Sequence, residues 1–333
     1  MQLRPGSLGA LVLLAVGAAC GGGGGSARLV PNFFAADVAI DARAPTTAVS
    51  HSPALCCDRN QGYAVWIEER SALDQRVLFS RTGNGGASWN ATPERLDTGP
   101  LLSGPRAAPQ ICCDGSHIYV CWLDWRRGTP DVRFNRSLDG GFSWLGRDLL
   151  VNVSQANALT HTSAVICCEG DDVHIAFTSL EDNSLRVALS RDAGGGFASA
   201  PFRIHGISAR PREPALCCDR GEVYVSWADL RDGLGDIYVN RSADGGTTWQ
   251  PDGVRIDRGV AGAAASRRPR ICCVQRRVYV AWEDGRDGGA TVYVNRSVDG
   301  AATWRTTDTR MDTLLLPPSA LGGYDVCWRC PGA

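Results

Sequence analysis

The sequence predicts an all-β protein, a β-propeller made of four-stranded blades. Two repeated features support this fold. A pair of adjacent cysteines recurs five times at intervals of 50–56 residues, and an aromatic residue follows ten residues after the first cysteine of each pair. A glycine-rich turn follows each aromatic residue in step with the other two markers. The cysteine pairs are Cys56-Cys57, Cys112-Cys113, Cys167-Cys168, Cys217-Cys218 and Cys272-Cys273.

Each repeat is expected to supply four short antiparallel strands, named A to D. In the fourth repeat, residues 214–218 form an apolar run and residues 223–227 alternate with β-branched and aromatic side chains. Residues 237–240 form the third run, and an Asp-Gly-Gly turn leads to a fourth strand within 249–257. Four strands in about 55 residues match one propeller blade.

The C–D turn carries a specific motif of the form Ser-x-Asp-x-Gly-x-x-Trp. It resembles the Asp box, or BNR repeat, of the sialidase-like propellers over roughly residues 31–310. The resemblance implies that the Asp boxes form turns on the face opposite the active site, where the aspartates bond their own backbone and the tryptophans pack between blades. The matching residues are Ser137, Asp139 and Trp144, then Ser242, Asp244 and Trp249, and finally Ser297, Asp299 and Trp304.

A single propeller domain is expected over residues 31–333, with six blades or, alternatively, five. Five repeats are complete. Residues 38–41 resemble the D strand at 254–257, and residues 319–328 resemble a decayed A and B pair. Both ends of the chain would then build a sixth blade that closes the ring.

The N-terminus has the features of an export signal. An apolar run of small residues ends at Cys20 and is too short to span a bilayer. We expect residues 1–20 to be a lipoprotein signal with Cys20 lipidated, and residues 21–30 to be a flexible glycine tether. Gly17 departs from the usual motif, so ordinary cleaved secretion is the alternative. Either way the protein is expected outside the cytoplasm, in a bacterial cell envelope or secreted, and at a membrane only through a lipid anchor.

The charge balance restricts the possible partners. There are 34 basic and 35 acidic residues, so a nucleic-acid partner is not expected. The chain contains no lysine, which excludes Schiff-base chemistry on lysine. Neither a cofactor nor a metal is expected, and the protein is expected to be a monomer.

The paired cysteines should be oxidised in an exported protein. Three arrangements are open: a disulfide within each pair, a disulfide between neighbouring blades, or free thiols that could hold a metal. Bonds between blades would follow from strand alternation, because adjacent side chains point to opposite faces. Cys327 and Cys330 at the C-terminus are interpreted as a terminal disulfide.

The functional face should be the one opposite the Asp boxes, where the D–A and B–C loops meet. Mixed arginines and carboxylates there could bind an anionic or polyhydroxylated ligand. The alternative is that the Asp–Arg pairs brace their own loops. The candidate ligand-binding residues are Arg106, Asp124, Trp125, Arg212, Asp229, Arg268 and Asp284.

The predicted function is binding of a glycan or protein ligand at this loop face without catalysis. The alternatives are a sialidase or another glycoside hydrolase, or a structural role in the envelope. The resemblance implies that a sialidase would need three clamping arginines, a tyrosine–glutamate pair and an aspartate. Arg106, Arg212 and Arg268 could form such a clamp, but the family's F/Y-R-I-P motif is absent near Leu55. Only Tyr324 lies outside the repeated strand positions.

Overall fold

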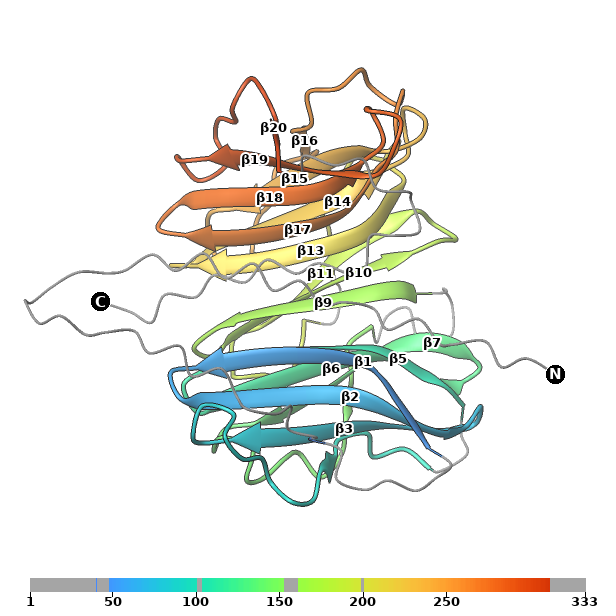
Figure 1. Cartoon of the computed structure of the whole chain (residues 1–333), viewed down its shortest axis with the longest axis vertical. Helices are drawn as coiled ribbons and strands as arrows, with labels where there is room; N and C mark the ends of the chain where they lie inside the picture. Colours follow the sequence, from blue (N-terminus) through green and yellow to red (C-terminus); the bar gives the residue numbers. More distant parts are fainter. Residues whose placement is uncertain (1–39, 41–47, 101–103, 153–160, 199–200, 312–333) are drawn as a thin grey trace, which may run out of the picture.

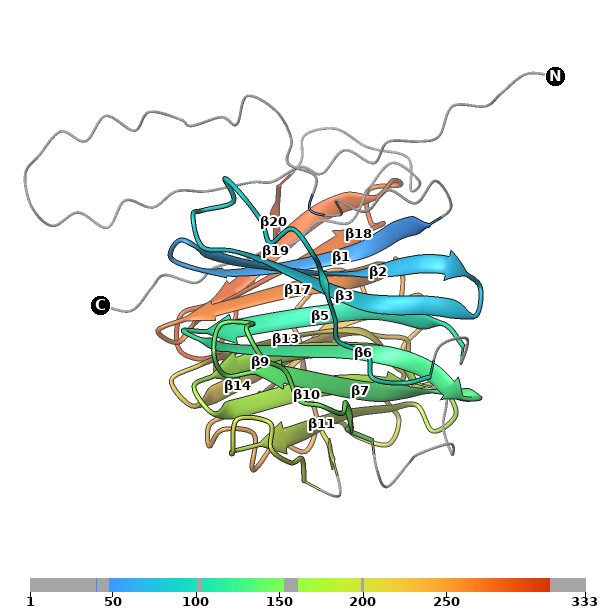
Figure 2. The ribbon, with the colours of Figure 1, turned by 90° about the horizontal axis from the view of Figure 1, so that it is seen from below.

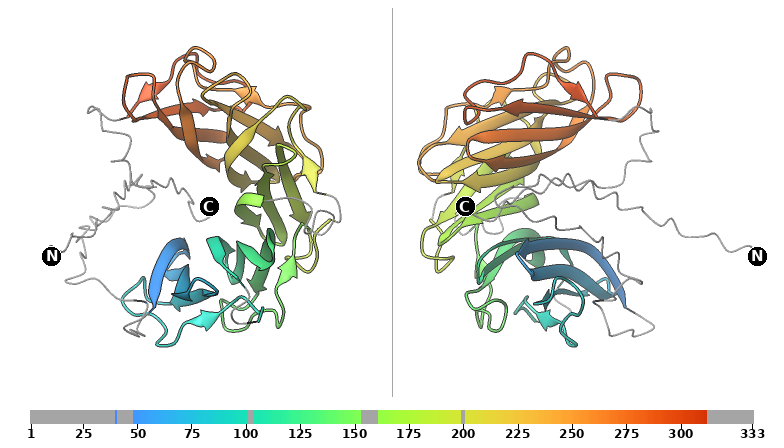
Figure 3. Two further views of the ribbon diagram at one scale, coloured as in Figure 1. Left: turned by 90° about the vertical axis from the view of Figure 1, so that its right-hand side faces the viewer. Right: turned by 60° about the vertical axis from the view of Figure 1, so that its left-hand side comes forward.

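The fold is a series of β-sheets arranged around a common axis. The computed structural model describes residues 40, 48–100, 104–152, 161–198 and 201–311. Their regular structure consists of five four-stranded antiparallel sheets, and each sheet is built from one sequence repeat. In Figure 3 (left) the sheets follow one another around a common axis from blue to red. The predicted all-β propeller, with one repeat per blade, is confirmed.

The two inner strands of each blade are long. The A strands, which pack against one another in neighbouring blades, are β1 (Val49–Asp58), β5 (Arg106–Asp114), β9 (His161–Glu169), β13 (Pro211–Asp219) and β17 (Ser266–Val274). The B strands are β2 (Gln61–Ser71), β6 (His117–Arg127), β10 (Asp172–Ser179), β14 (Glu222–Asp229) and β18 (Arg277–Asp284). Figures 1 and 2 show these strands stacked from blade to blade.

The outer strands differ in length. The C strands are β3 (Asp74–Thr82), β7 (Thr129–Ser137), β11 (Ser184–Ser190), β15 (Asp236–Ser242) and β19 (Thr291–Ser297). The D strands are β4 (Glu94–Arg95), β8 (Leu149–Leu150), β12 (Phe202–Arg203), β16 (Val254–Arg255) and β20 (Thr309–Arg310). The D strands are shorter than the sequence suggested, because only two residues of each pair regularly with strand C.

The blades are joined by the apolar residue that follows each of the first four D strands. Leu96, Val151, Ile204 and Ile256 are fully buried, and each packs into the core of the next blade. Ile40 has the same relation to the first blade, since it packs against Trp66 and Leu78. This contact is what a D strand ahead of the first blade would make.

The remaining predictions for the ends of the chain fall outside the described residues. Cys20, the glycine tether, Tyr324, Cys327 and Cys330 lie there, and so does most of the expected sixth blade. The described part of the chain contains no helix long and apolar enough to cross a membrane.

The three Asp-box turns are closed by their own side chains. The Ser137 hydroxyl bonds Asp139 Oδ1 at 2.7 Å, and the same oxygen accepts the backbone N–H of Ser143 at 2.9 Å. Ser242 with Asp244 and Ser297 with Asp299 repeat the first contact at 2.7 Å. Hydrogen bonds from Thr248 and Ser242 hold the pKa of Asp244 at about 2.

The same turn geometry persists where the motif has decayed. In the third blade Ser190 bonds Asp192 at 2.6 Å, and in the first blade Thr82 bonds Asn84 at 2.8 Å. Trp144, Trp249 and Trp304 are partly buried against the core clusters that join the blades. The turns also bond the A–B turns of their own blades, as in Gly245 N to Gly221 O at 2.7 Å. Asp-box and A–B turns therefore occupy one end of each blade, and the D–A and B–C loops occupy the other.

Replacing Asp244 with alanine should lower the free energy of unfolding by about 1 kcal/mol, because the turn loses its acceptor. Thermal or chemical unfolding measures this. Asp244→Asn keeps one acceptor oxygen, as Asn84 does in the first blade, so it should lose less. Equal losses in the two variants would contradict the assigned role of the carboxylate.

Candidate functional site

The aspartates at the ends of the B strands brace the loop face from inside. Asp124, Asp229 and Asp284 are fully buried. Arg231 donates to Asp229 at 2.7 Å, and the Trp227 indole N–H donates to it at 2.9 Å. Burial alone would raise the pKa of Asp229, but these hydrogen bonds outweigh it and the pKa is lowered.

The same unit recurs in the second and fifth blades. Each bracing arginine also pairs with a second aspartate in the loop before strand D, as Arg231 does with Asp252 at 2.8 Å. Removing one partner of such a buried network costs about 3–5 kcal/mol. The three aspartates therefore stabilise the B–C loops from within. The equivalent contacts are Arg126 with Asp124 and Asp148, and Arg286 with Asp284 and Asp308.

Arg106 and Trp125 also lie in the interior or at its edge. The Arg106 side chain is fully buried and pairs with Asp97 and Asp124, each at 3.3 Å. Trp125 is partly buried against the core shared by the second and third blades. The three arginines expected to clamp one ligand therefore do not converge, since Arg106 is an internal counter-ion.

Arg212 and Arg268, by contrast, reach solvent on neighbouring A strands. Arg268 bonds the buried carboxylate of Glu283 at 3.0 Å, and Arg267 bonds the same carboxylate at 3.1 Å. We call Arg267 and Arg268 the arginine pair. Their side chains are 40% and 46% exposed, whereas that of Glu283 is 1% exposed.

A bulge in strand β17 places the side chains of Arg267 and Arg268 where they reach solvent. The strand register shifts between Arg267 and Arg270, and Arg268 has a positive φ of 50°. A bulge turns consecutive side chains in new directions. The backbone N–H of Arg268 also donates to Glu213 on β13 at 2.7 Å, next to Arg212. The bulge therefore brings the arginine pair and Arg212 to adjoining parts of two blades.

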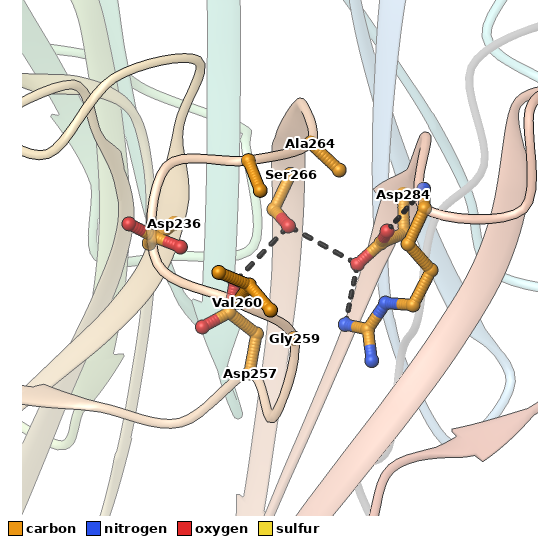
Figure 4. A pocket seen from close by; sticks show the side chains of 9 residues that line it. Asp236, Asp257, Gly259, Val260, Ala264, Ser266 and Asp284 are labelled. Carbon is orange, nitrogen blue, oxygen red and sulfur yellow. Dashed lines mark hydrogen bonds and ion pairs between the residues drawn. The ribbon is translucent and has the colours of Figure 1, made fainter.

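A pocket of about 220 Å³ opens between the fourth and fifth blades. Three aspartates and Arg286 contribute to its lining, and Figure 4 shows Ser266 between Asp257 and Asp284. The Ser266 hydroxyl lies 3.0 Å from Asp257 and 3.1 Å from Asp284. One hydroxyl proton can satisfy only one carboxylate at a time.

Asp257 is the acid of the pocket whose pKa is raised most. Burial raises its pKa to about 6; nearby Asp236 adds to the rise, whereas Arg255 opposes it. Arg255 bonds both, at 2.6 Å to Asp257 and 2.9 Å to Asp236. A carboxyl group with this pKa can hold or release a proton near neutral pH.

The pocket exists because of one residue at the start of strand A. At the corresponding interface of the first two blades, Arg106 fills the space and neutralises Asp97. Between the second and third blades His161 lies there, 3.1 Å from Asn152. Ser266 is too short to fill the equivalent space beside Asp257, so the interface between the fourth and fifth blades keeps a pocket, and Asp257 in it pairs with Arg255.

One cluster among the described residues could hold a metal ion. The ligand atoms of Cys167, His174 and Cys218 lie within 4.8 Å of one another, between the third and fourth blades. Two thiols and an imidazole form a donor set that suits zinc. The cluster lies away from the loop face, because His174 also bonds Gly245 O in the Asp-box turn at 3.0 Å.

The site residues predicted from the sequence do not include Asp257, Ser266 or Glu283, although the repeat pattern contains a signal for them. Glu283 occupies a position that is apolar in three other repeats, where Ile67, Leu123 and Ala228 stand. The third repeat has Thr178 there, so Glu283 is the one acid at this position of the five repeats, and such a departure can mark a residue that serves something other than the fold. The other signal is Ser266, which stands where the second repeat has Arg106.

Comparison with known proteins supports the fold. No protein-family model and no curated protein matches the chain. Among solved structures, a protein of unknown function from Dyadobacter fermentans is similar with a TM-score of 0.55 and 14% identity, covering 84% of this chain and 85% of the other. These values establish a shared architecture and nothing finer.

Two fungal enzymes share the architecture. The GH93 α-L-arabinofuranosidase of Fusarium graminearum has a TM-score of 0.54 and 12% identity over 82% of this chain and 85% of its own. The α-L-arabinanase of Penicillium chrysogenum has a TM-score of 0.52 and 14% identity over 78% of this chain and 80% of its own. The fold is thus a β-propeller of the class found in these glycoside hydrolases. Membership of the sialidase family stays a resemblance.

The raised pKa of Asp257 predicts how stability depends on pH. A group whose pKa is raised on folding stabilises the fold fully below its unfolded value of about 4, and this contribution is lost as pH rises through about 6. Asp257→Asn cannot ionise, so its stability relative to the parent protein should improve between pH 4 and 6. Urea unfolding of both proteins across this range measures the difference; a constant difference would contradict the assignment.

Proposed function

We propose that this protein binds an acidic glycan through the arginine pair and Arg212 at the loop face of the fourth and fifth blades. The observation that carries this is the arginine pair on the single buried carboxylate of Glu283. Both guanidinium groups bond Glu283 and still have side chains that are 40% and 46% exposed, so paired arginine donors reach solvent on this surface. Arginine presents planar, paired donors that match a carboxylate or sulfate group.

The surroundings strengthen the preference for an anion. Arg212 lies on the adjoining strand, where it donates to Pro211 O at 2.7 Å and to Asn183 at 3.3 Å. Burial lowers the pKa of Arg212, and the neighbouring Arg210 adds to this effect. Arg212 and Arg210 repel one another, and a bound anion would relieve that repulsion. The ligand class is a saccharide that carries a carboxylate or sulfate group, such as a uronic acid.

Binding without catalysis is the simpler proposal for this surface. Glu283 accepts hydrogen bonds from both guanidinium groups of the arginine pair, and Glu213 accepts one from the backbone N–H of Arg268. A general acid must be able to transfer a proton to the substrate, and a carboxylate already bonded to two guanidinium groups is poorly placed for that role. The arginine pair therefore supports recognition of an anion.

Replacing Arg268 with alanine should weaken binding of an acidic oligosaccharide by a factor of roughly 10 to 150, the equivalent of one charged hydrogen bond. Arg212→Ala should act in the same direction. Arg277→Ala is the matched control, because Arg277 is exposed at the other end of the fifth blade. Glycan-array screening followed by calorimetry with the best acidic ligand measures the effect. Unchanged affinity in both arginine variants, or an equal loss in Arg277→Ala, would overturn the proposal.

A second candidate is glycoside hydrolysis at the pocket between the fourth and fifth blades. The observation in its favour is Asp257, an acid with a pKa of about 6 beside Asp284 and Asp236. Glycosidases pair an acid of raised pKa with a second carboxylate. The similar structures include enzymes named as arabinanase and arabinofuranosidase.

The hydrolase candidate predicts product release from neutral arabino-oligosaccharides by the parent protein and at least a 100-fold loss in Asp257→Asn. Thin-layer chromatography and reducing-sugar assays detect the products. Arg268→Ala should retain full hydrolysis, because it lies outside the pocket. No turnover of any tested glycoside by the parent protein would eliminate this candidate and leave the binding proposal intact.

A further inference from the structure

The cysteine pairs occupy regular strand, and this decides which neighbour each sulfur can meet. Cys217 pairs with Tyr224 and Cys218 with Val223 in the uninterrupted register between β13 and β14. Consecutive residues of an extended strand point to opposite faces. Two sulfurs on opposite faces cannot join without a distortion of the backbone. A disulfide within a pair is therefore disfavoured at these positions.

The opposite faces of each A strand point toward the two neighbouring blades. The first cysteine of one blade meets the second cysteine of the next. Cys56 packs with Cys113 in one core cluster, Cys112 with Cys168 in another, and Cys217 with Cys273 in a third. Direct side-chain contacts join the same partners and also Cys167 with Cys218.

We propose that these contacts are the sites of four disulfide bonds that link the five blades in series. The bonds are Cys56–Cys113, Cys112–Cys168, Cys167–Cys218 and Cys217–Cys273, and we call them the disulfide ladder. The ladder explains why cysteines occur two at a time: an interior blade has two neighbours and needs one sulfur for each. It also gives every bond the same diagonal rule, from the first cysteine of one blade to the second of the next.

The chemistry requires an oxidant, and the natural class is a protein or small molecule that carries a reactive disulfide. Each pair of thiols loses two protons and two electrons as one sulfur–sulfur bond forms. The disulfide of the oxidant accepts them and becomes two thiols. Exchange begins from a thiolate, which is the nucleophile.

The third bond has a neighbour that the others lack. His174 stands where the other repeats have Tyr63, Tyr119, Tyr224 and Tyr279. His174 contacts the sulfur of Cys218 and also bonds Gly245 O at 3.0 Å, so this contact between the third and fourth blades has an imidazole beside it.

Peptide mapping tests the ladder. The reduced full-length protein is oxidised with glutathione disulfide, quenched in acid with an alkylating agent, and digested with trypsin without reduction. The ladder predicts one cross-linked assembly that contains all five cysteine-pair peptides. Five separate peptides, each lacking two hydrogens, would show bonds within the pairs and overturn it; five fully alkylated peptides would do the same.

Matched double variants test the diagonal rule at the first two blades. Cys57→Ser with Cys112→Ser leaves Cys56 and Cys113, so the link between the first two cysteine-pair peptides should persist. Cys56→Ser with Cys113→Ser leaves Cys57 and Cys112, so that link should disappear. Retention in both variants, or loss in both while the proteins stay folded by circular dichroism, contradicts the rule.

The third bond is tested against metal binding by the same sulfurs. The ladder predicts that oxidised protein carries no stoichiometric zinc and that His174→Tyr, which restores the residue of the repeat, still forms Cys167–Cys218. One tightly bound zinc per purified chain that is lost in His174→Tyr, with Cys167 and Cys218 open to alkylation after the zinc is removed, would overturn the third bond. Elemental analysis and peptide mapping of the oxidised protein provide both measurements.

Discussion

Each blade of this propeller can bury both faces of its sheet only against its neighbours, and the whole structure depends on that contact. An apolar residue after a short D strand fills the core of the following blade, as Ile256 does beside Trp282. The tryptophans of the Asp-box turns pack at the same interfaces. Since a four-stranded sheet exposed on both faces would not be stable alone, the blades fold and persist as a ring.

The two ends of each blade differ in the side-chain interactions that hold their turns and loops in place. At one end the turns are closed by short hydrogen bonds between serine or threonine and aspartate, and they hold the C–D hairpins in place. At the other end buried Asp–Arg networks brace the B–C loops. Arg267 and Arg268 differ from the arginines of these networks, because their side chains stay 40% and 46% exposed while both bond Glu283.

The repeat also shows where selection for something other than the fold has acted. Positions that keep the same residue type in every blade, such as the aromatic residue of strand B, maintain packing between blades. Positions that vary among the blades alter the local chemistry without altering the backbone. Ser266 opens a pocket beside Asp257, Glu283 anchors two arginines, and His174 sets one cysteine contact apart from the other three.

The sequence by itself determined the fold class, the repeat boundaries and the turn motif, because these depend on local periodicity and on the spacing of residues along one chain. It also indicated that the cysteines serve a common structural purpose. It could not separate buried from exposed charges at the loop face. Asp124, Asp229 and Asp284 have the composition of a ligand site, yet they lie inside, next to arginines two residues further along the chain. Only the tertiary structure decided which arginines reach solvent and which sulfurs meet, because both depend on contacts between blades about 55 residues apart in sequence.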